Sequence, residues 1–247
     1  MARHLLIVLA AAALLLPASP STAQGPPFEL GVERSERFGG SSGTLIFSAD
    51  ALEYLTTDRD DARRWTYDDV KQLQVLSPTR ISVRTYEDRG GLRFGADRTF
   101  DFTVVRGAAS TELVTFLLER IDRPVVSAVM PQYAGEPLAR VRVKHLRQQR
   151  GSEGTLLLFD RRLVYLTEQD EASRYWRFRD IESVLRLDRF RLQIAVYEGS
   201  GTRPFVFELK SDLPDGFYDL LWARVNPPGL PLSPSGAGDR LASTIGE

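Results

Sequence analysis

The strongest constraint on the fold of this chain is an internal duplication. Residues 43–87 align without a gap onto residues 154–198, an offset of 111 positions, and 14 of the 45 aligned residues are identical. The identical pairs include Gly43/Gly154, Tyr54/Tyr165, Trp65/Trp176, Asp69/Asp180, Tyr86/Tyr197 and Glu87/Glu198. A repeated unit folds the same way each time, so any prediction for one copy has to hold for the other.

Each copy is predicted as a run of short strands followed by one helix. Apolar residues alternate with polar ones in the first strand of both copies, at Leu30 and Val32 and again at Val141 and Val143. The first copy predicts further strands at 44–47, 52–56, 63–67, 73–76, 81–86 and 100–104, with a brief helical turn at 67–70. Apolar residues at helical spacing predict terminal helices over 111–121 and 215–225.

The segments outside the two copies differ from them in composition. Units spanning 28–122 and 138–225 are joined by residues 123–137, whose three prolines predict an extended, semi-rigid linker. Residues 226–247 are rich in Pro, Gly and Ser without periodicity, which predicts a disordered tail.

The N-terminus has the pattern of a secretory signal. Arg3 precedes an apolar run from Leu5 to Leu16, which is too short to cross a bilayer, and Ser21–Ala23 fits a cleavage site. Residues 1–23 are therefore predicted as a signal peptide, with an uncleaved anchor as the alternative, and the protein as periplasmic or extracellular. No other segment approaches transmembrane length. Because the chain has no cysteine, an exported protein of this kind has to rely on apolar burial instead of disulfides.

Several motifs of the two copies resemble the pleckstrin-homology-like superfamily, which includes the bacterial PH and GRAM domains. They are the Gly-Thr-Leu start of the second strand, the L-x-Y-L-T third strand, and W-x-Y-x-D-V at 65–70 with W-x-F-x-D-I at 176–181. The resemblance implies a mostly β fold with one C-terminal helix per domain, and two barrel or sandwich domains in tandem. Phosphoinositide-binding members carry a basic loop between the first two strands. Here that loop is 34–37 or 147–150, and Glu36 departs from the pattern.

Catalytic and metal-binding sites have little support. The net charge of −1 gives no indication of nucleic acid binding, and no cofactor or metal is expected. His145 is the one histidine outside the signal, which leaves too few ligands for a zinc site. It is expected to be a partly exposed strand residue. Ser41 lies in a G-x-S-x-G motif, but a strand follows it where a nucleophile elbow needs a helix.

Other repeated polar and aromatic residues have structural interpretations. Asp69 and Asp180 are predicted to N-cap a short helical turn, and Trp65 and Trp176 are predicted to anchor the core. In the first strands, Glu29, Glu33 and Glu36 of one copy align with Arg140, Lys144 and Arg147 of the other. One interpretation is that the opposite charges hold the two copies, or several chains, together. The alternative is that two solvated surfaces diverged in sequence.

The candidate binding residues are Arg89, Arg93 and Arg98, in an insertion of about six residues found only in the first copy. Three arginines on a glycine-rich hairpin are able to bind an acidic group, although a solvated loop elaboration is the simpler explanation. We therefore expect a non-catalytic binding module for a protein or an acidic envelope component. An oligomer-forming scaffold, a lipid carrier and an uncharacterised enzyme are the alternatives.

Overall fold

The computed structural model describes residues 26–35, 40–88, 97–132, 135–147 and 151–227. The predicted signal peptide at 1–23 and residues 228–247 of the predicted tail lie outside this part of the chain. Within it, fifteen strands and two α-helices are present, so the chain is mostly β, as predicted. None of the helices in these ranges is both long and apolar enough to cross a membrane.

The first copy forms seven strands and one helix, called here the first half. The strands are β1 (Phe28–Ser35), β2 (Gly40–Phe47), β3 (Ala51–Thr56), β4 (Arg63–Thr66), β5 (Val70–Ser77), β6 (Arg80–Asp88) and β7 (Asp97–Arg106). A 3-10 turn, η1 (Tyr67–Asp69), precedes β5, and α1 (Thr111–Arg120) follows β7. Ser110 caps α1 by accepting a hydrogen bond from the Leu113 amide.

The second copy repeats these elements and is called the second half. Its strands are β9 (Ala139–Leu146), β10 (Ser152–Leu158), β11 (Arg162–Leu166), β12 (Arg174–Arg177), β13 (Ile181–Asp188), β14 (Arg191–Glu198) and β15 (Gly201–Leu209). The turn η2 (Phe178–Asp180) precedes β13, and α2 (Phe217–Val225) closes the half. The predicted order of short strands followed by one helix is thus confirmed in both copies.

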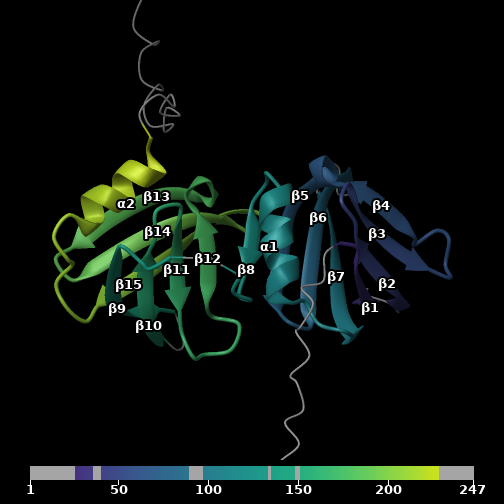
Figure 1. Ribbon diagram of the computed structural model, residues 1–247, viewed down its shortest axis with the longest axis horizontal. Helices are drawn as coiled ribbons and strands as arrows, with labels where there is room; N and C mark the ends of the chain where they lie inside the picture. The colour runs from purple at the N-terminus through teal and green to yellow at the C-terminus, as the bar shows by residue number, and fades with distance from the viewer. Residues whose placement is uncertain (1–25, 36–39, 89–96, 133–134, 148–150, 228–247) are drawn as a thin grey trace, which may run out of the picture.

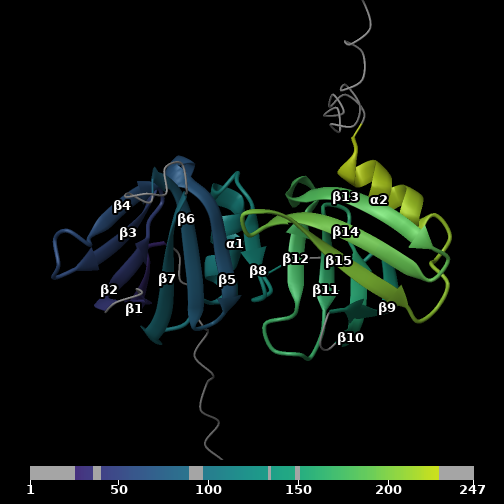
Figure 2. The same ribbon diagram turned by 180° about the vertical axis from the view of Figure 1, so that it is seen from behind.

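The segment predicted as an extended linker, 123–137, contains a strand that joins the halves. This strand, β8 (Val125–Ser127), pairs parallel with β5 and antiparallel with β12. The described strands therefore form one continuous open sheet in the order β13-β14-β15-β9-β10-β11-β12-β8-β5-β6-β7-β1-β2-β3-β4 (Figures 1 and 2). An unpaired strand edge exposes backbone donors and acceptors, and β8 covers two such edges at once.

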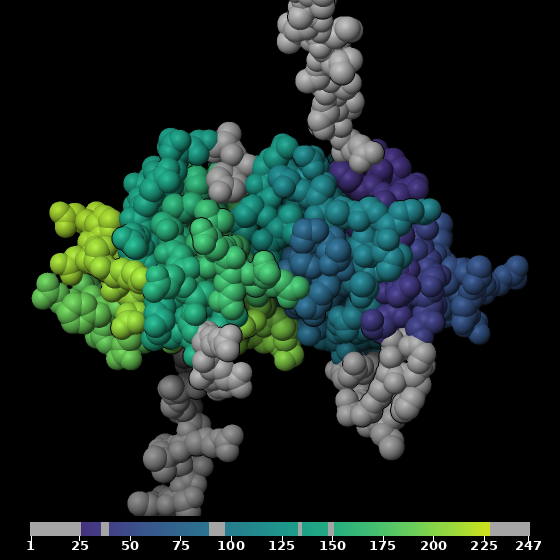
Figure 3. All heavy atoms as spheres, turned by 90° about the horizontal axis from the view of Figure 1, so that it is seen from below, coloured from purple at the N-terminus to yellow at the C-terminus, as the bar shows by residue number. Residues whose placement is uncertain are grey.

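Two hydrophobic clusters fill the curled sheet, and they do not divide strictly by half. The first includes Val125 of β8 and, from the second half, Leu157, Phe159, Val164 and Tyr175. The second is formed by side chains of the second half alone. Helix α1 therefore lies at the junction between the halves, whereas α2 lies at one end of the molecule and the β3–β4 hairpin at the other (Figures 1 and 3).

The repeated glycine and tyrosine of each copy form one packing unit. Tyr54 donates a hydrogen bond of 2.8 Å to the Ser41 carbonyl, and Tyr165 donates one of 2.7 Å to the Ser152 carbonyl. A Cβ atom on Gly43 would lie 2.7 Å from the Tyr54 ring, and one on Gly154 would lie 2.7 Å from the Tyr165 ring. Because no real Cβ approaches so closely, these positions require glycine, which explains their identity in both copies.

Arg177, at the end of β12, holds the junction. Its guanidinium donates to the carbonyls of Leu118 (3.0 Å), Ile121 (2.7 Å) and Arg123 (2.8 Å). It also forms a two-point ion pair with Asp180, at 2.6 and 3.0 Å, and both side chains are largely buried. One residue of the second half thus satisfies carbonyls at the end of α1 that have no partner within that helix.

We expect Arg177→Ala to lower the free energy of unfolding by about 3–5 kcal/mol, because it leaves the buried Asp180 carboxylate without its cation. Arg177→Ala/Asp180→Ala should recover part of this loss. Arg179→Ala removes an exposed ion pair with Asp122 and should cost at most about 1 kcal/mol, so it is the matched control. Urea denaturation measures all three variants. Equal losses for Arg177→Ala and Arg179→Ala would contradict this account of the junction.

Candidate functional site

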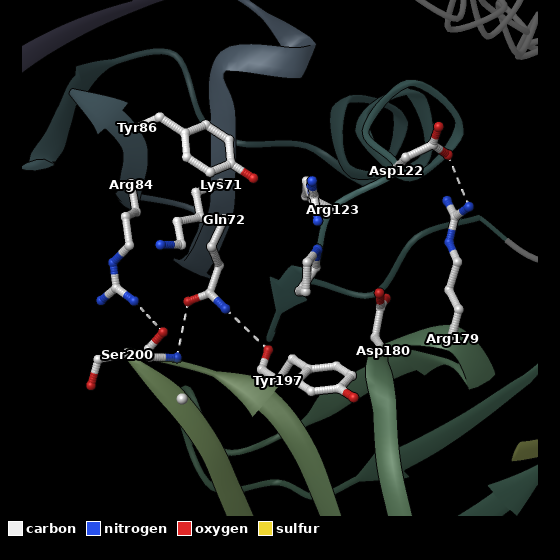
Figure 4. Close-up of a pocket in the computed structure, with 13 residues that line it drawn as sticks. Lys71, Gln72, Arg84, Tyr86, Asp122, Arg123, Arg179, Asp180, Tyr197 and Ser200 are labelled. Carbon is white, nitrogen blue, oxygen red and sulfur yellow. Dashed lines mark hydrogen bonds and ion pairs between the residues drawn. The ribbon is translucent and has the colours of Figure 1, made fainter. Parts of the chain in front are cut away.

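A cleft of about 400 Å³ lies between the two halves (Figure 4). The first half contributes Lys71 and Gln72 from β5, Arg84 and Tyr86 from β6, and Asp122–Pro124 from the segment leading into β8. The second half contributes Arg179 and Asp180 from η2, Tyr197 from β14 and the β14–β15 turn at 199–201. We call this the junction cleft. Since each half supplies part of its lining, the cleft depends on how the halves are joined.

Polar contacts across the cleft fix its floor. The Gln72 amide nitrogen donates to the Tyr197 carbonyl at 3.0 Å, and its oxygen accepts from the Gly199 amide at 2.9 Å. Arg84 donates to the Gly199 carbonyl (Figure 4). A side-chain amide that bonds two backbone groups of another element acts like a short strand contact, so the β14–β15 turn is held against β5 and β6.

Positive charge exceeds negative charge in the junction cleft. Lys71 pairs with Asp97 at 2.7 Å, and Arg179 pairs with Asp122 at 2.9 Å. Burial raises the pKa of the Asp180 carboxyl, against the opposing effect of Arg177, which pairs with it. Among the described residues, Arg123 forms no carboxylate contact, and its guanidinium lies 5.9 Å from the centre of the Tyr86 ring.

Two exposed tyrosines flank these cations. Tyr86 and Tyr197 occupy equivalent positions in the two copies, and both line the cleft. The Lys71 amine lies 5.5 Å from the centre of the Tyr86 ring, within the range of a cation–π contact. The tyrosine identity was visible in the sequence. The sequence did not show that the two rings line one cleft, because this depends on how the two halves are joined.

The cleft has the properties of a binding site. It combines guanidinium and ammonium donors with two aromatic rings, which suits an acidic group carried on a larger molecule. Within the described ranges, no group of three histidine, aspartate or glutamate side chains is placed to hold a metal ion.

A second polar site recurs in each half. In the first half it lies where β1 and β6 end and where β2, β4 and β7 begin. In the first half the Glu87 carboxylate lies 3.6 Å from Arg63, 3.9 Å from Arg98 and 2.5 Å from the Trp65 indole nitrogen. Of the three predicted binding arginines, Arg98 lies in the part of the chain that the structure describes. It lies over the Phe100 ring at 4.9 Å. Arg89 and Arg93 lie outside the described residues.

The second half repeats this arrangement with one paired change. Glu198 binds Arg174 at 3.2 Å and Arg203 at 2.5 Å, as Glu87 binds Arg63 and Arg98. However, the first half also holds an ion pair between the buried Arg34 and Asp61, whereas the equivalent residues are His145 and Ala172. A cation and its anion have thus been exchanged together for two uncharged residues, which avoids leaving one charge buried alone.

His145 is buried, with 3 % of its surface exposed, and not partly exposed as the sequence predicted. Its ring stacks on Phe205 with 4.9 Å between the centres, and Arg147 donates to its Nδ1 atom at 3.3 Å. Burial, together with Arg147, Arg203 and Arg174, lowers the pKa of His145 to about 4. The imidazole is therefore neutral near pH 7 and forms part of the core.

The remaining sequence candidates have structural roles. Ser41 bonds to Tyr54 at 2.8 Å and to Asp61, and it belongs to the other half from His145. Asp69 does not N-cap the η1 turn itself. Thr66 is the N-cap, and Asp69 closes a capping box by accepting from the Thr66 amide at 2.8 Å and from its hydroxyl at 2.6 Å. These hydrogen bonds lower the pKa of Asp69.

Asp180, the repeat partner of Asp69, likewise accepts from the backbone of its N-cap residue, Arg177, and it also binds the Arg177 guanidinium. Trp65 and Trp176 are buried against Phe100 and Phe205, as predicted. The oppositely charged first strands, β1 and β9, are separated by seven strands of the sheet, so they do not bring the halves together.

Comparisons with known proteins add no assignment. No family model matches the chain, and no curated protein matches it. A solved C-terminal domain of an unknown protein from Leishmania infantum is 13% identical, and the match covers 36% of this chain and 84% of that one, with a TM-score of 0.30. The Spt16D Pob3N heterodimer is 7% identical over 70% of this chain and 84% of that one, with a TM-score of 0.28. Likenesses this low do not bear on function.

The neutral state of His145 predicts a specific pH dependence. The unfolded chain, with a histidine pKa near 6.5, takes up a proton before the folded protein does, so the free energy of unfolding falls as the pH drops from about 6.5 toward about 4. The total decrease in the free energy of unfolding over this pH range amounts to about 3 kcal/mol. His145→Phe should remove this part of the pH dependence in urea denaturation, and an unchanged slope would show that His145 does not carry it.

The companion variant is Ala172→Asp, which supplies a carboxylate at the position of Asp61. A nearby anion favours the imidazolium form, so the pKa of His145 should rise. NMR titration of the imidazole C–H signals measures it directly. A pKa that stays near 4 would mean that the carboxylate does not reach the ring.

Proposed function

We propose that this protein is an exported, non-catalytic binding protein made of two pleckstrin-homology-like units, and that it binds an acidic segment of a partner protein in the junction cleft. The observation that carries this proposal is the Arg123 guanidinium, which lies in a cleft beside Tyr86 without a carboxylate partner among the described residues. Arg123 is exposed at the cleft, and a guanidinium binds a carboxylate most favourably through two parallel hydrogen bonds.

The composition of the cleft favours a protein as the partner. Arginine and tyrosine are enriched where protein interfaces gain most of their binding energy, and Tyr86 and Tyr197 are both exposed beside the cations. A rim of aromatic rings around a charged centre excludes water from the contact that forms there. An acidic peptide segment supplies both the carboxylate for Arg123 and the surface to cover the two rings.

Two further lines support the wider proposal. Each half has its strands in the same order and ends in a helix, as the family resemblance of the sequence implies. The apolar N-terminal run with its small-residue cleavage pattern supports export. A non-catalytic role is supported by the separation of Ser41 and His145 into different halves and by the structural hydrogen bonds that both residues make.

An oligomer-forming scaffold is the second candidate. It is favoured by the exposed Glu29 and Glu33 of β1 and the exposed Arg140 of β9, which lie far apart in one chain. Arg140 pairs with the exposed Glu136 in this chain, and a second chain could exchange that partner for Glu29 or Glu33. Sedimentation at several protein concentrations separates the two candidates. A strict monomer rules out the scaffold and leaves the binding function.

The cleft can be tested with a fluorescent peptide of eight glutamates and, as the opposite probe, a peptide of eight lysines. We expect the glutamate peptide to bind and Arg123→Glu to weaken it at least tenfold. Tyr86→Ala/Tyr197→Ala should also weaken it without a change of charge. The matched control is Arg189→Glu, which makes the same charge change on the exposed β13–β14 turn. Fluorescence anisotropy measures the affinities.

Equal effects of Arg123→Glu and Arg189→Glu would show that the peptide responds to overall charge and would refute the cleft as the site. Preference for the lysine peptide would refute it as well. Arg177 binds the backbone carbonyl of Arg123, which Arg123→Glu retains, so this variant should keep the stability of the parent protein.

A further inference from the structure

The duplication gives the strand at the far end of the sheet, β13, a counterpart whose surroundings are known. That counterpart is β5, which pairs with β6 on one side and with β8 on the other. Strand β13 pairs with β14 on one side, and no strand of the described residues covers its other edge. At this edge the Val184 carbonyl meets the Tyr218 hydroxyl at 3.3 Å, a long contact.

The surface along this edge is apolar and exposed. Leu185 and Leu187 of β13 are 48 % and 45 % exposed, and Trp222 of α2, which packs on β13, is 47 % exposed. In the first half the residue equivalent to Leu185 is the polar Gln74, and the residue equivalent to Trp222 is Leu118, which is 9 % exposed. The open end of the second half thus exposes more apolar surface than a solvated sheet edge requires.

A second copy of the chain does not fit this surface. At the junction, the second half covers α1 and β8 with Leu157, Phe159, Val164 and Tyr175. The equivalent residues on the outer face of the first half are Ile46, Ser48, Glu53 and Arg64, and the last two form an ion pair at 2.9 Å. A second chain would bring this polar face to the edge of β13, so it lacks the apolar residues that the junction uses.

The chain itself continues from α2 as it does from α1. Helix α1 is followed by Ile121-Asp122-Arg123-Pro124 and then β8, whereas α2 ends in Val225-Asn226-Pro227-Pro228 and continues with Gly229-Leu230-Pro231-Leu232-Ser233. Aligning the two prolines places Leu230 at the position of Val126 and Leu232 at that of Ala128. The segment that covers β5 in the first half therefore has an equivalent directly after α2.

The register of β8 on β5, applied to the second half, would place these leucines on the exposed patch. Gln74 lies opposite Val126, so the equivalent pair in the second half is Leu185 with Leu230. Two residues further along, the same register pairs Leu187 with Leu232, on the same face of the sheet because side chains alternate. In this register both leucines of the segment would lie beside the two exposed leucines of β13.

The prolines fit the same register. The Ala128 amide donates to the Val75 carbonyl at 3.0 Å, and alternate residues of a strand point the same way, so Val126 also directs its amide toward β5. The equivalent residues, Leu230 and Leu232, both have an amide to donate. Pro231 takes the place of Ser127, which faces β12. Its missing donor would lie on the outer side, where the sheet ends.

From this geometry we propose that residues 228–233 bind along β13 as a parallel strand, in the place that β8 takes on β5, and cover Leu185 and Leu187. The segment acts as the last strand of the sheet and protects an edge that would otherwise pair with other chains. This proposal does not depend on the junction cleft or on the function proposed for it.

The test compares the full mature chain with a variant that ends at Pro227. Hydrogen–deuterium exchange is measured on peptides that cover β13, whose Val184 and Arg186 amides face the open edge. We expect exchange in β13 to be at least tenfold slower in the full chain. Leu230→Asp/Leu232→Asp should exchange as fast as the shortened chain, and Leu241→Asp, a matched change further along the tail, should behave as the full chain does.

Equal exchange in the full and shortened chains would overturn the proposal. So would a slowing that grows with protein concentration, because the strand would then come from a second chain. Quenching of tryptophan fluorescence by acrylamide gives an independent measurement. Trp65 and Trp176 are buried, so the quenched signal comes from Trp222, and it should increase when the tail is removed.

Discussion

The pairing of β8 with both β5 and β12 determines most of what is particular to this molecule. Each half ends in a strand edge with unpaired backbone groups, and three residues of the connecting segment cover two of these edges. Arg177 strengthens the joint from the second half, because it binds carbonyls at the end of α1 and the buried Asp180 together. Without this strand the halves would be two separate sheets, joined by side-chain contacts such as those of Arg177 and Gln72.

The junction cleft follows from that joint. Gln72 reaches across to the β14–β15 turn, and Tyr86 and Tyr197, which are equivalent in the repeat, meet there. The same tyrosine of each copy thus lines one shared site, and neither copy needs a different residue at this position. What differs between the copies, such as Lys71 and Arg84 in the first and Arg179 in the second, then sets the charge of the cleft.

The two copies also differ at a buried polar site by the exchange of a cation together with its anion. Arg34 and Asp61 form an ion pair in the first half, and His145 and Ala172 replace both of its members in the second. Either change alone would have left a charge buried in the core. The glutamate that holds two arginines, Glu87 or Glu198, is common to both halves, which indicates that this part of the cluster is structural.

The sequence was enough to predict the repeat, the order of strands, the helix that ends each copy and the burial of Trp65 and Trp176. These follow from periodicity and residue type, which act over short distances along the chain. It did not predict that 123–137 holds a strand, because Val125–Ser127 is too short to show a period, nor that His145 is buried. The junction cleft was equally hidden, since the contacts of Gln72 with Tyr197 and Gly199 join residues 125 and 127 positions apart, and only the packing of one half against the other brings them together.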